Sequence, residues 1–424
     1  MKRIALGVLS VFIIVNLLTG CGHKNQIDIE PKPDAVTLNF FGFKVGQTQS
    51  EVLEELISGF EAENPGVKIN YEGLGNADGY LDVLYKRIDA GETDDLFMLN
   101  PFAFSVARER GYIGKNIYDL KDQPFLEKYN DTIRSLLDVD GHVLAVPMEA
   151  GAIGLLANTD ILNQLGLPLP QTYADFINCC EVLSQNNVAP VVVGFGTGGY
   201  TSGHIFAMAR SLGKMDLEAI DYAALEIGGA SIGELFRPGF ELVDEFNQQG
   251  YWTVVDSHDS ADWSEDMEIF TAGGAAFMAT GSWQLQRVEL AEPDFEYEFS
   301  ALPLGDDDNV AVIRASTPIC ANAQGEHLDL ALKFLEYISQ KEHVEAFTRS
   351  QTALSPLKDG AKPVAILEQM DKVIQEGRVT TDSEPRFPVD LVTQHLILSQ
   401  DIVSGSKTVE EAVAYLDSMV NAEK

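Results

Sequence analysis

The feature that most constrains the fold is a regular alternation of strand-like and helix-like segments between residues 35 and 99. Three stretches with strand character enclose two with apolar residues at helical spacing: Ala35–Phe41, Ser50–Phe60, Val67–Tyr71, Tyr80–Ala90 and Asp94–Leu99. Strand–helix–strand–helix–strand is the pattern of a parallel sheet covered by helices. The chain is therefore predicted to be an α/β protein.

Length and charge limit what such a protein can do. The chain has 424 residues, enough for two domains, and 45% of them are hydrophobic, enough for large cores. The formal net charge is −36. Nucleic-acid binding needs basic patches, so this charge argues against a nucleic-acid partner.

The N-terminal segment has the order of a targeting signal. Lys2 and Arg3 precede an apolar run, Ile4–Leu18, which is too short to span a bilayer comfortably. Small residues then lead into Cys21. This order resembles a bacterial lipoprotein signal, so we expect a signal peptide at 1–20, lipidation (palmitate) of Cys21 and a tether at 21–34. An ordinary secretory signal with an unrelated cysteine is the alternative.

The remaining cysteines do not form a disulfide framework. If Cys21 carries lipid, an odd number of thiols is left, namely Cys179, Cys180 and Cys320. We expect them to be small buried hydrophobic residues.

A second informative stretch is residues 267–283. A helical end stops at Gly273-Gly274, and the apolar run Ala275–Ala279 follows and ends at Trp283. A run bounded by glycines is typical of a strand that is buried on both faces. Ligands of open α/β sheets bind outside the carboxyl ends of strands, so Trp283 is a candidate ligand contact. Packing of the indole in the core is the alternative.

Five segments, taken in order, resemble one protein family: Leu81–Phe97, Asp140–Pro147, Phe270–Trp283, Leu330–Ile338 and Ser404–Ala412. The second reads Asp-Gly-His-Val-Leu-Ala-Val-Pro, and the third ends in Gly-Ser-Trp. The family is the extracellular solute-binding proteins, family 1, which are carbohydrate-binding lipoproteins of ABC importers. The resemblance covers nearly all of residues 36–420.

The resemblance implies a two-lobed, periplasmic-binding-protein-like fold (type II, Venus flytrap) with a hinge and an interlobe ligand cleft. We expect one lobe at 35–146 plus 301–352 and the other at 147–300 plus 353–424. It also implies a receptor that binds a sugar, an oligosaccharide above all, and delivers it to a membrane permease. Such a receptor is a monomer anchored on the outer face of the cell membrane. It has no catalytic residues, cofactor or metal.

Sugar chemistry and the family motifs select the candidate contacts. Aromatic rings stack on the C–H faces of sugars, while carboxylates and amides pair with the hydroxyls, which are costly to bury unpaired. The predicted ligand contacts are Trp283, Glu149, Trp263, Tyr200, Phe43, Asn100 and Arg386. A structural role stays open for six of them: core packing for Trp283 and Phe43, a solvated carboxylate for Glu149, lobe packing for Trp263, a helix cap for Asn100 and a structural contact for Arg386. The family often has tryptophan where this chain has Tyr200.

Other motifs compete with this interpretation. Residues 194–199 match the G-x-G-x-x-G of dinucleotide loops, and residues 229–233 match the G-x-S-x-G of a nucleophile elbow around Ser231. The elbow needs a preceding strand, and the residues before it are predicted to end a helix. A cell-surface hydrolase using Ser231 and a receptor for polyamines, which would suit the acidic charge, are the alternative functions.

Overall fold

The structure is a computed structural model that describes residues 36–75, 79–195, 202–255, 265–381, 386–388 and 391–422. Cys21, Tyr200 and Trp263 lie outside these residues, as does most of the 194–199 motif. The signal peptide, the tether and these two aromatic contacts therefore stay predictions. None of the helices in the described ranges has the length and apolar character needed to cross a bilayer.

The strand–helix alternation at the start of the chain is confirmed. It gives, in order, β1 (Val36–Gly42), α1 (Gln47–Glu63), β2 (Val67–Gly73), α2 (Tyr80–Ala90) and β3 (Leu96–Met98). Strand β1 pairs in parallel with β2 on one side and with β3 on the other. Helix α2 ends because Gly91 adopts the left-handed conformation, with φ 73°. Strands β1 to β3 form the sheet of the first lobe.

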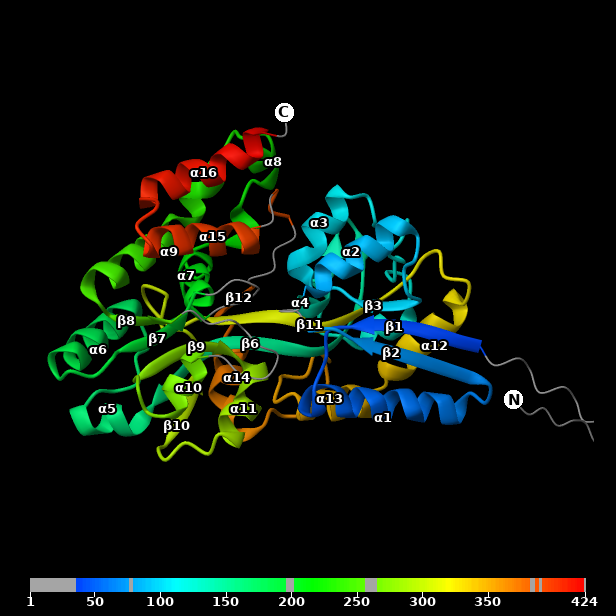
Figure 1. The fold of residues 1–424 in the computed structure, drawn as a ribbon, viewed down its shortest axis with the longest axis horizontal. Coiled ribbons are helices and arrows are strands. Elements are labelled where there is room, and N and C mark those ends of the chain that lie inside the picture. The colour runs from blue at the N-terminus through cyan, green and yellow to red at the C-terminus, as the bar shows by residue number, and fades with distance from the viewer. Residues whose placement is uncertain are drawn as a thin grey trace, which may run out of the picture.

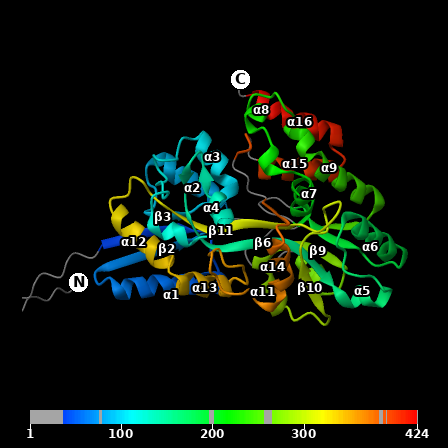
Figure 2. The ribbon, with the colours of Figure 1, turned by 180° about the vertical axis from the view of Figure 1, so that it is seen from behind.

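Two long antiparallel strands connect this lobe to the second one. Strand β6 (Val146–Asn158) pairs with β11 (Ala311–Ala321) from Val312 opposite Ile153 to Ile319 opposite Val146. Both strands run through the middle of the molecule and join two groups of helices and strands (Figure 1). The view from behind shows the same division (Figure 2). The fold is thus two-lobed.

The second lobe is built around β7 (Val191–Gly194), β8 (Trp252–Val255) and β9 (Phe277–Gly281), where β7 pairs in parallel with both neighbours. Within the described residues the continuous strand order is β2-β1-β3-β11-β6-β9-β7-β8. Strand β10 (Tyr297–Ser300) pairs with β6, and β12 (Val379–Thr381) pairs with β11. The short strands β4 (Asp138–Val139) and β5 (His142–Val143) form a separate hairpin.

Helices cover both lobes. Those placed around the first lobe and the junction are α3 (Phe104–Glu109), α4 (Asp131–Ser135), α12 (Leu328–Ile338), α13 (Lys341–Ser350) and α14 (Glu368–Gln375). Those around the second lobe are α5 (Thr159–Leu165), α6 (Tyr173–Gln185), α7 (Ser202–Leu212), α8 (Tyr222–Glu226), α9 (Ile232–Gln249), α10 (Glu265–Thr271), α11 (Leu285–Leu290), α15 (Leu391–Val403) and α16 (Val409–Ala422).

The apolar side chains form two separate cores. One contains residues of β1, β3, α1 and α12, such as Phe40 and Phe334, and the other contains residues of β7, α6, α7 and α9, such as Phe176 and Phe240. The first core also contains second-lobe residues such as Val192, Phe270 and Met278, so it continues across the junction between the lobes. Strands β6 and β11 contribute side chains to both cores. The residue bounds expected for the lobes stay a prediction.

Candidate ligand-binding site

The strand register gathers several predicted contacts at the carboxyl ends of the first-lobe strands. Phe41 of β1 lies opposite Phe97 of β3. Lys44 and Asn100 each come three residues after this pair, so they follow the ends of their strands by the same number of residues. Ile319 of β11 lies opposite both Met98 and Val146. Glu149, three residues after Val146, is therefore just beyond the carboxyl end of β3. This is the position at which open α/β sheets bind ligands.

Glu149 is the centre of a buried polar cluster at this position. Its Oε1 accepts hydrogen bonds from Lys44 Nζ at 3.2 Å and from Thr317 Oγ1 at 2.6 Å. Lys44 Nζ also donates to Gln351 Oε1 at 2.8 Å. Glu149 is 2% exposed and Lys44 is 6% exposed, so the two opposite charges compensate each other in a largely dry environment. Among the described residues, Oε2 of Glu149 has no hydrogen-bond partner.

Trp283 reaches the same region from the second lobe. It follows β9, in which Gly281 lies opposite Ile153 of β6, so the indole is roughly level with Gly151. A side chain at Gly281 would collide with the indole, which shows that the ring lies directly on the Gly281 backbone. The Arg314 guanidinium lies over the ring, 4.9 Å from its centroid.

Glu149 and Arg314 belong to the same face of the two connecting strands. In an antiparallel pair, opposite residues share a face, and so do alternate residues along each strand. Glu149 lies opposite Ser316, and Gly151 lies opposite Arg314. A Cβ at Gly151 would come within 2.5 Å of Ser316 Oγ, so this glycine makes room for the side chains of β11. The site thus combines a charged cluster, in which Lys44 follows the first-lobe strand β1 and Glu149 lies on the connecting strand β6, with an indole that follows the second-lobe strand β9.

The three other described candidates have different surroundings. Phe43 is 9% exposed and packs edge-on against Tyr80, with ring centroids 5.4 Å apart. Asn100 is half-buried and precedes the short 3-10 turn Pro101–Ala103, but its side chain makes no capping hydrogen bond there. Arg386 is exposed, and its guanidinium lies 4.4 Å from the ring centroid of Tyr222.

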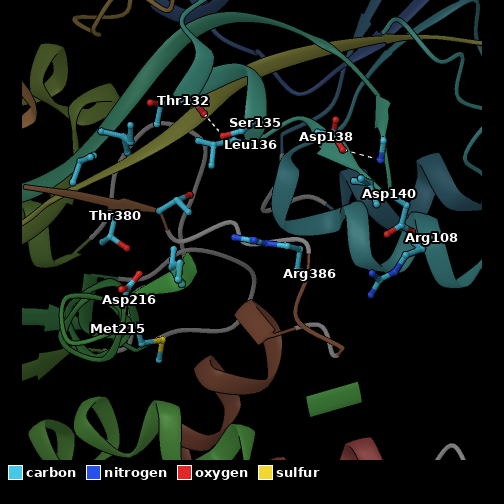
Figure 3. A pocket seen from close by; sticks show the side chains of 16 residues that line it. Arg108, Thr132, Ser135, Leu136, Asp138, Asp140, Met215, Asp216, Thr380 and Arg386 are labelled. Atoms are coloured by element: carbon cyan, nitrogen blue, oxygen red, sulfur yellow. Dashed lines mark hydrogen bonds between the residues drawn. The ribbon is translucent and has the colours of Figure 1, made fainter. Parts of the chain in front are cut away.

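A cavity of about 700 Å³ lies between residues of the two lobes (Figure 3). Its lining combines α3, α4 and the β4–β5 hairpin with residues 215–217, β12 and Arg386. Ile313 also lines it, and successive residues of a strand point to opposite faces. This cavity therefore contacts the face of β11 opposite to Arg314. Of the seven predicted contacts, the described lining contains Arg386.

Sequence reasoning missed Lys44, Arg314, Thr317 and Gln351. Lys44 could have been found, because it directly follows Phe43 at the end of the first predicted strand. The other three lie on β11 and after α13, far along the chain from Glu149, and no local pattern marks them. Their contribution depends on the strand pairing.

The G-x-S-x-G match around Ser231 has a structural role. Ser231 caps α9: its Oγ accepts a hydrogen bond from Glu234 N at 3.0 Å and donates to Asp417 Oδ2 at 2.7 Å. The element before it is helix α8, not the strand that a nucleophile elbow requires. No group of metal-binding side chains is found in the described part of the chain.

Comparison with known proteins agrees with this architecture. The family model described as bacterial extracellular solute-binding protein matches residues 46–345. The multiple sugar-binding protein of Streptococcus mutans is 22% identical over 352 residues, covering 81% of this chain and 80% of that protein. The melibiose/raffinose/stachyose-binding protein of Bacillus subtilis is 25% identical over 187 residues, covering 44% and 41%. A sugar transporter of Bacillus licheniformis, solved in complex with stachyose, superposes with a TM-score of 0.72 at 18% identity, covering 91% of this chain and 99% of that one.

Proposed function

This chain belongs to the bacterial extracellular solute-binding protein family, and we propose that it binds an oligosaccharide between its two lobes. The observation that carries this proposal is the strand register, which places the Trp283 indole close to the buried Glu149 carboxylate and to Lys44 of the first lobe. The relatives named for multiple sugars, and for melibiose, raffinose and stachyose, support a sugar ligand. These relatives are binding proteins, and we propose no catalytic step for this chain.

Each group in the site can make a contact that suits a sugar ligand. The partly exposed indole of Trp283 can stack on the C–H face of a pyranose ring. The free Oε2 of Glu149 can accept a hydrogen bond from a hydroxyl, and a charged acceptor makes this bond a strong one. Tyr200, Trp263, Asn100, Phe43 and Arg386 are proposed as further contacts. A ligand that touches both lobes stabilises the closed form, because it binds that form better than the open one.

We further propose a cellular arrangement for the receptor. Lipid on Cys21 would hold a monomer at the outer face of the cell membrane, and the segment 21–34 would act as the tether. The closed form would deliver its sugar to the permease of an ABC importer, whose ATPase supplies the energy. The lobe bounds 35–146 plus 301–352 and 147–300 plus 353–424 belong to the same proposal.

Thermal unfolding of residues 22–424 with a ligand panel tests the function. The panel contains raffinose, stachyose and other oligosaccharides, with spermidine and amino acids as controls. A sugar at 1,000 times its Kd should add about 4 kcal/mol. At roughly 2–4 °C per kcal/mol, the unfolding midpoint rises by about 8–16 °C. A shift with spermidine alone would point to a polyamine receptor, and consumption of the sugar would point to a hydrolase.

A tryptophan pair tests the site itself. Trp283→Ala should abolish most of the affinity for the sugar that gives the shift. Trp252→Phe is the matched control, because this indole is buried in β8 among the second-lobe core residues. Equal affinity of Trp283→Ala and the unmodified protein in calorimetric titration would refute the stacking role.

A further inference from the structure

Thr317 has a backbone conformation that is unfavourable both for a β-branched residue and for a residue before proline. Its φ is 46°, in the left-handed region that β-branched residues rarely adopt. The following residue is Pro318, and a residue before proline is normally extended. Thr317 is also 1% exposed, within a strand that is otherwise regular on both sides. Such strained residues concentrate at functional sites, where the surrounding structure holds them.

The unusual backbone changes the direction of the Thr317 side chain. Ser316 lies opposite Glu149, so it shares the face of Glu149. In a regular strand the next residue, Thr317, would point to the opposite face. Instead, Thr317 Oγ1 donates to Glu149 Oε1 at 2.6 Å. The left-handed turn thus brings the hydroxyl to the side of the sheet on which Glu149 lies.

The hydrogen bond determines which oxygen of Glu149 is left for a ligand. Lys44 Nζ and Thr317 Oγ1 both donate to Oε1. Oε2 is buried and has no partner among the described residues. Two donors on one oxygen fix the carboxylate plane and present Oε2 as an acceptor. A carboxylate with a single donor could rotate and lose this orientation.

We propose that Thr317 is a positioning residue of the ligand site, whose strained backbone orients Glu149 to accept a ligand hydroxyl. This inference rests on the proposed function, because it assumes that the ligand carries a hydroxyl that Oε2 binds. Thr317 does not touch the ligand in this proposal. It acts through Glu149 alone.

Three substitutions separate the hydroxyl from the backbone strain. Thr317→Val keeps the shape and removes the donor, and we expect its affinity for the oligosaccharide to fall about 10- to 100-fold, the effect of losing a hydrogen bond to a charged group. Thr317→Ser keeps the donor and should bind within about twofold of the unmodified protein. Thr317→Gly removes the donor and relieves the strain. It should unfold at a higher temperature than Thr317→Val and still bind weakly.

The matched control is Thr348→Val, because Thr348 is also buried and donates to the Met148 carbonyl at 3.3 Å rather than to Glu149. Its affinity should stay unchanged. A purely structural role of Thr317 predicts that affinity follows the unfolding temperature across the variants, and that result would overturn the proposal. If Thr317→Val does not fold, the serine and glycine variants answer the same question.

A double-mutant cycle with Glu149→Gln completes the test. Thr317→Val should cause no further loss of affinity when Glu149 is already glutamine, since the two residues act as a unit. Additive losses would show that Thr317 acts independently of Glu149, against the proposal. If the unmodified protein binds no oligosaccharide, the proposed function itself fails. If the unmodified protein binds sugar and Thr317→Val binds it with the same affinity, this inference alone fails.

Discussion

The buried ion pair between Lys44 and Glu149 makes a sharp stability prediction. Their charged atoms are 3.2 Å apart, and both side chains are less than 10% exposed. At an effective dielectric constant of about 20, such a pair attracts by about 5 kcal/mol. Lys44→Met removes the cation and leaves the carboxylate buried with the Thr317 hydroxyl. Breaking a buried pair in this way costs about 3–5 kcal/mol.

Scanning calorimetry of the ligand-free protein at pH 7 measures this cost. At roughly 2–4 °C per kcal/mol, the unfolding midpoint of Lys44→Met should fall by about 6–20 °C. The matched control is Lys68→Met, which breaks a Lys68–Glu61 pair whose lysine is 67% exposed. Exposed pairs contribute about 0–1 kcal/mol, so this control should change the midpoint little.

The double variant Lys44→Met with Glu149→Gln distinguishes the pair from its surroundings. A neutral glutamine does not need a buried cation, so the double variant should recover much of the lost stability. It should still bind sugar poorly, because the charged acceptor is gone. If Lys44→Met destabilises the protein no more than Lys68→Met does, the reasoning about the buried pair is wrong.

Three other predictions concern residues outside the site. Burial, with a smaller contribution from the neighbouring His204, holds the pKa of His395 well below its ordinary value of 6.5. His395 is therefore protonated in the unfolded chain but stays neutral in the native protein. The free energy of unfolding falls as the pH drops below 6.5, by about 1.4 kcal/mol at pH 5.5. His395→Phe should remove this part of the pH dependence in denaturant titrations. Ser231→Ala should cost about 1 kcal/mol through the lost cap of α9 and leave sugar affinity unchanged, and an affinity loss would contradict the capping role. Cys179, Cys180 and Cys320 should react with a disulfide reagent at pH 8 only after unfolding, since all three thiols are buried and burial raises the pKa of Cys179 to about 11.

The first lobe could be predicted because its signals are local. Alternating apolar residues and a terminating glycine mark β1 to β3 and the two helices between them, and all five elements appear as expected. The run that precedes Trp283 likewise forms a fully buried strand, β9. These patterns are visible within a short window of the sequence, so no knowledge of the tertiary structure is needed to recognise them.

Strand β11 was not predicted, and the reason lies in its function as a connection. Its sequence contains Arg314, Ser316, Thr317 and Pro318 in the middle of an otherwise apolar run. Polar residues and a proline normally argue against a central strand. Here they occur where the strand passes from one lobe to the other, beside the candidate site. The strand can hold them because Trp283, Gly151 and Glu149 provide the complementary surface.

The candidate site was predicted in part, for a related reason. Glu149 and Trp283 follow recognisable family segments, whereas their partners are set by pairing at long range. Lys44 and Thr317 are 105 and 168 residues away from Glu149 along the chain. A single sequence gives no information about such pairs, because nothing in a local window indicates which strand lies next to β6.

The residues that break local rules lie together in the structure. Thr317 is left-handed within a strand, Gly151 interrupts the side chains of β6, and Gly281 has the Trp283 indole on its backbone. Each feature disfavours a regular strand, and a buried carboxylate oxygen without a partner adds a further cost at Glu149. Sequences tend to retain such local conflicts where function requires them. We therefore infer the position of the candidate site from the places where local preference and structure disagree, without reference to any relative. The Thr317 and Lys44 variants test this inference.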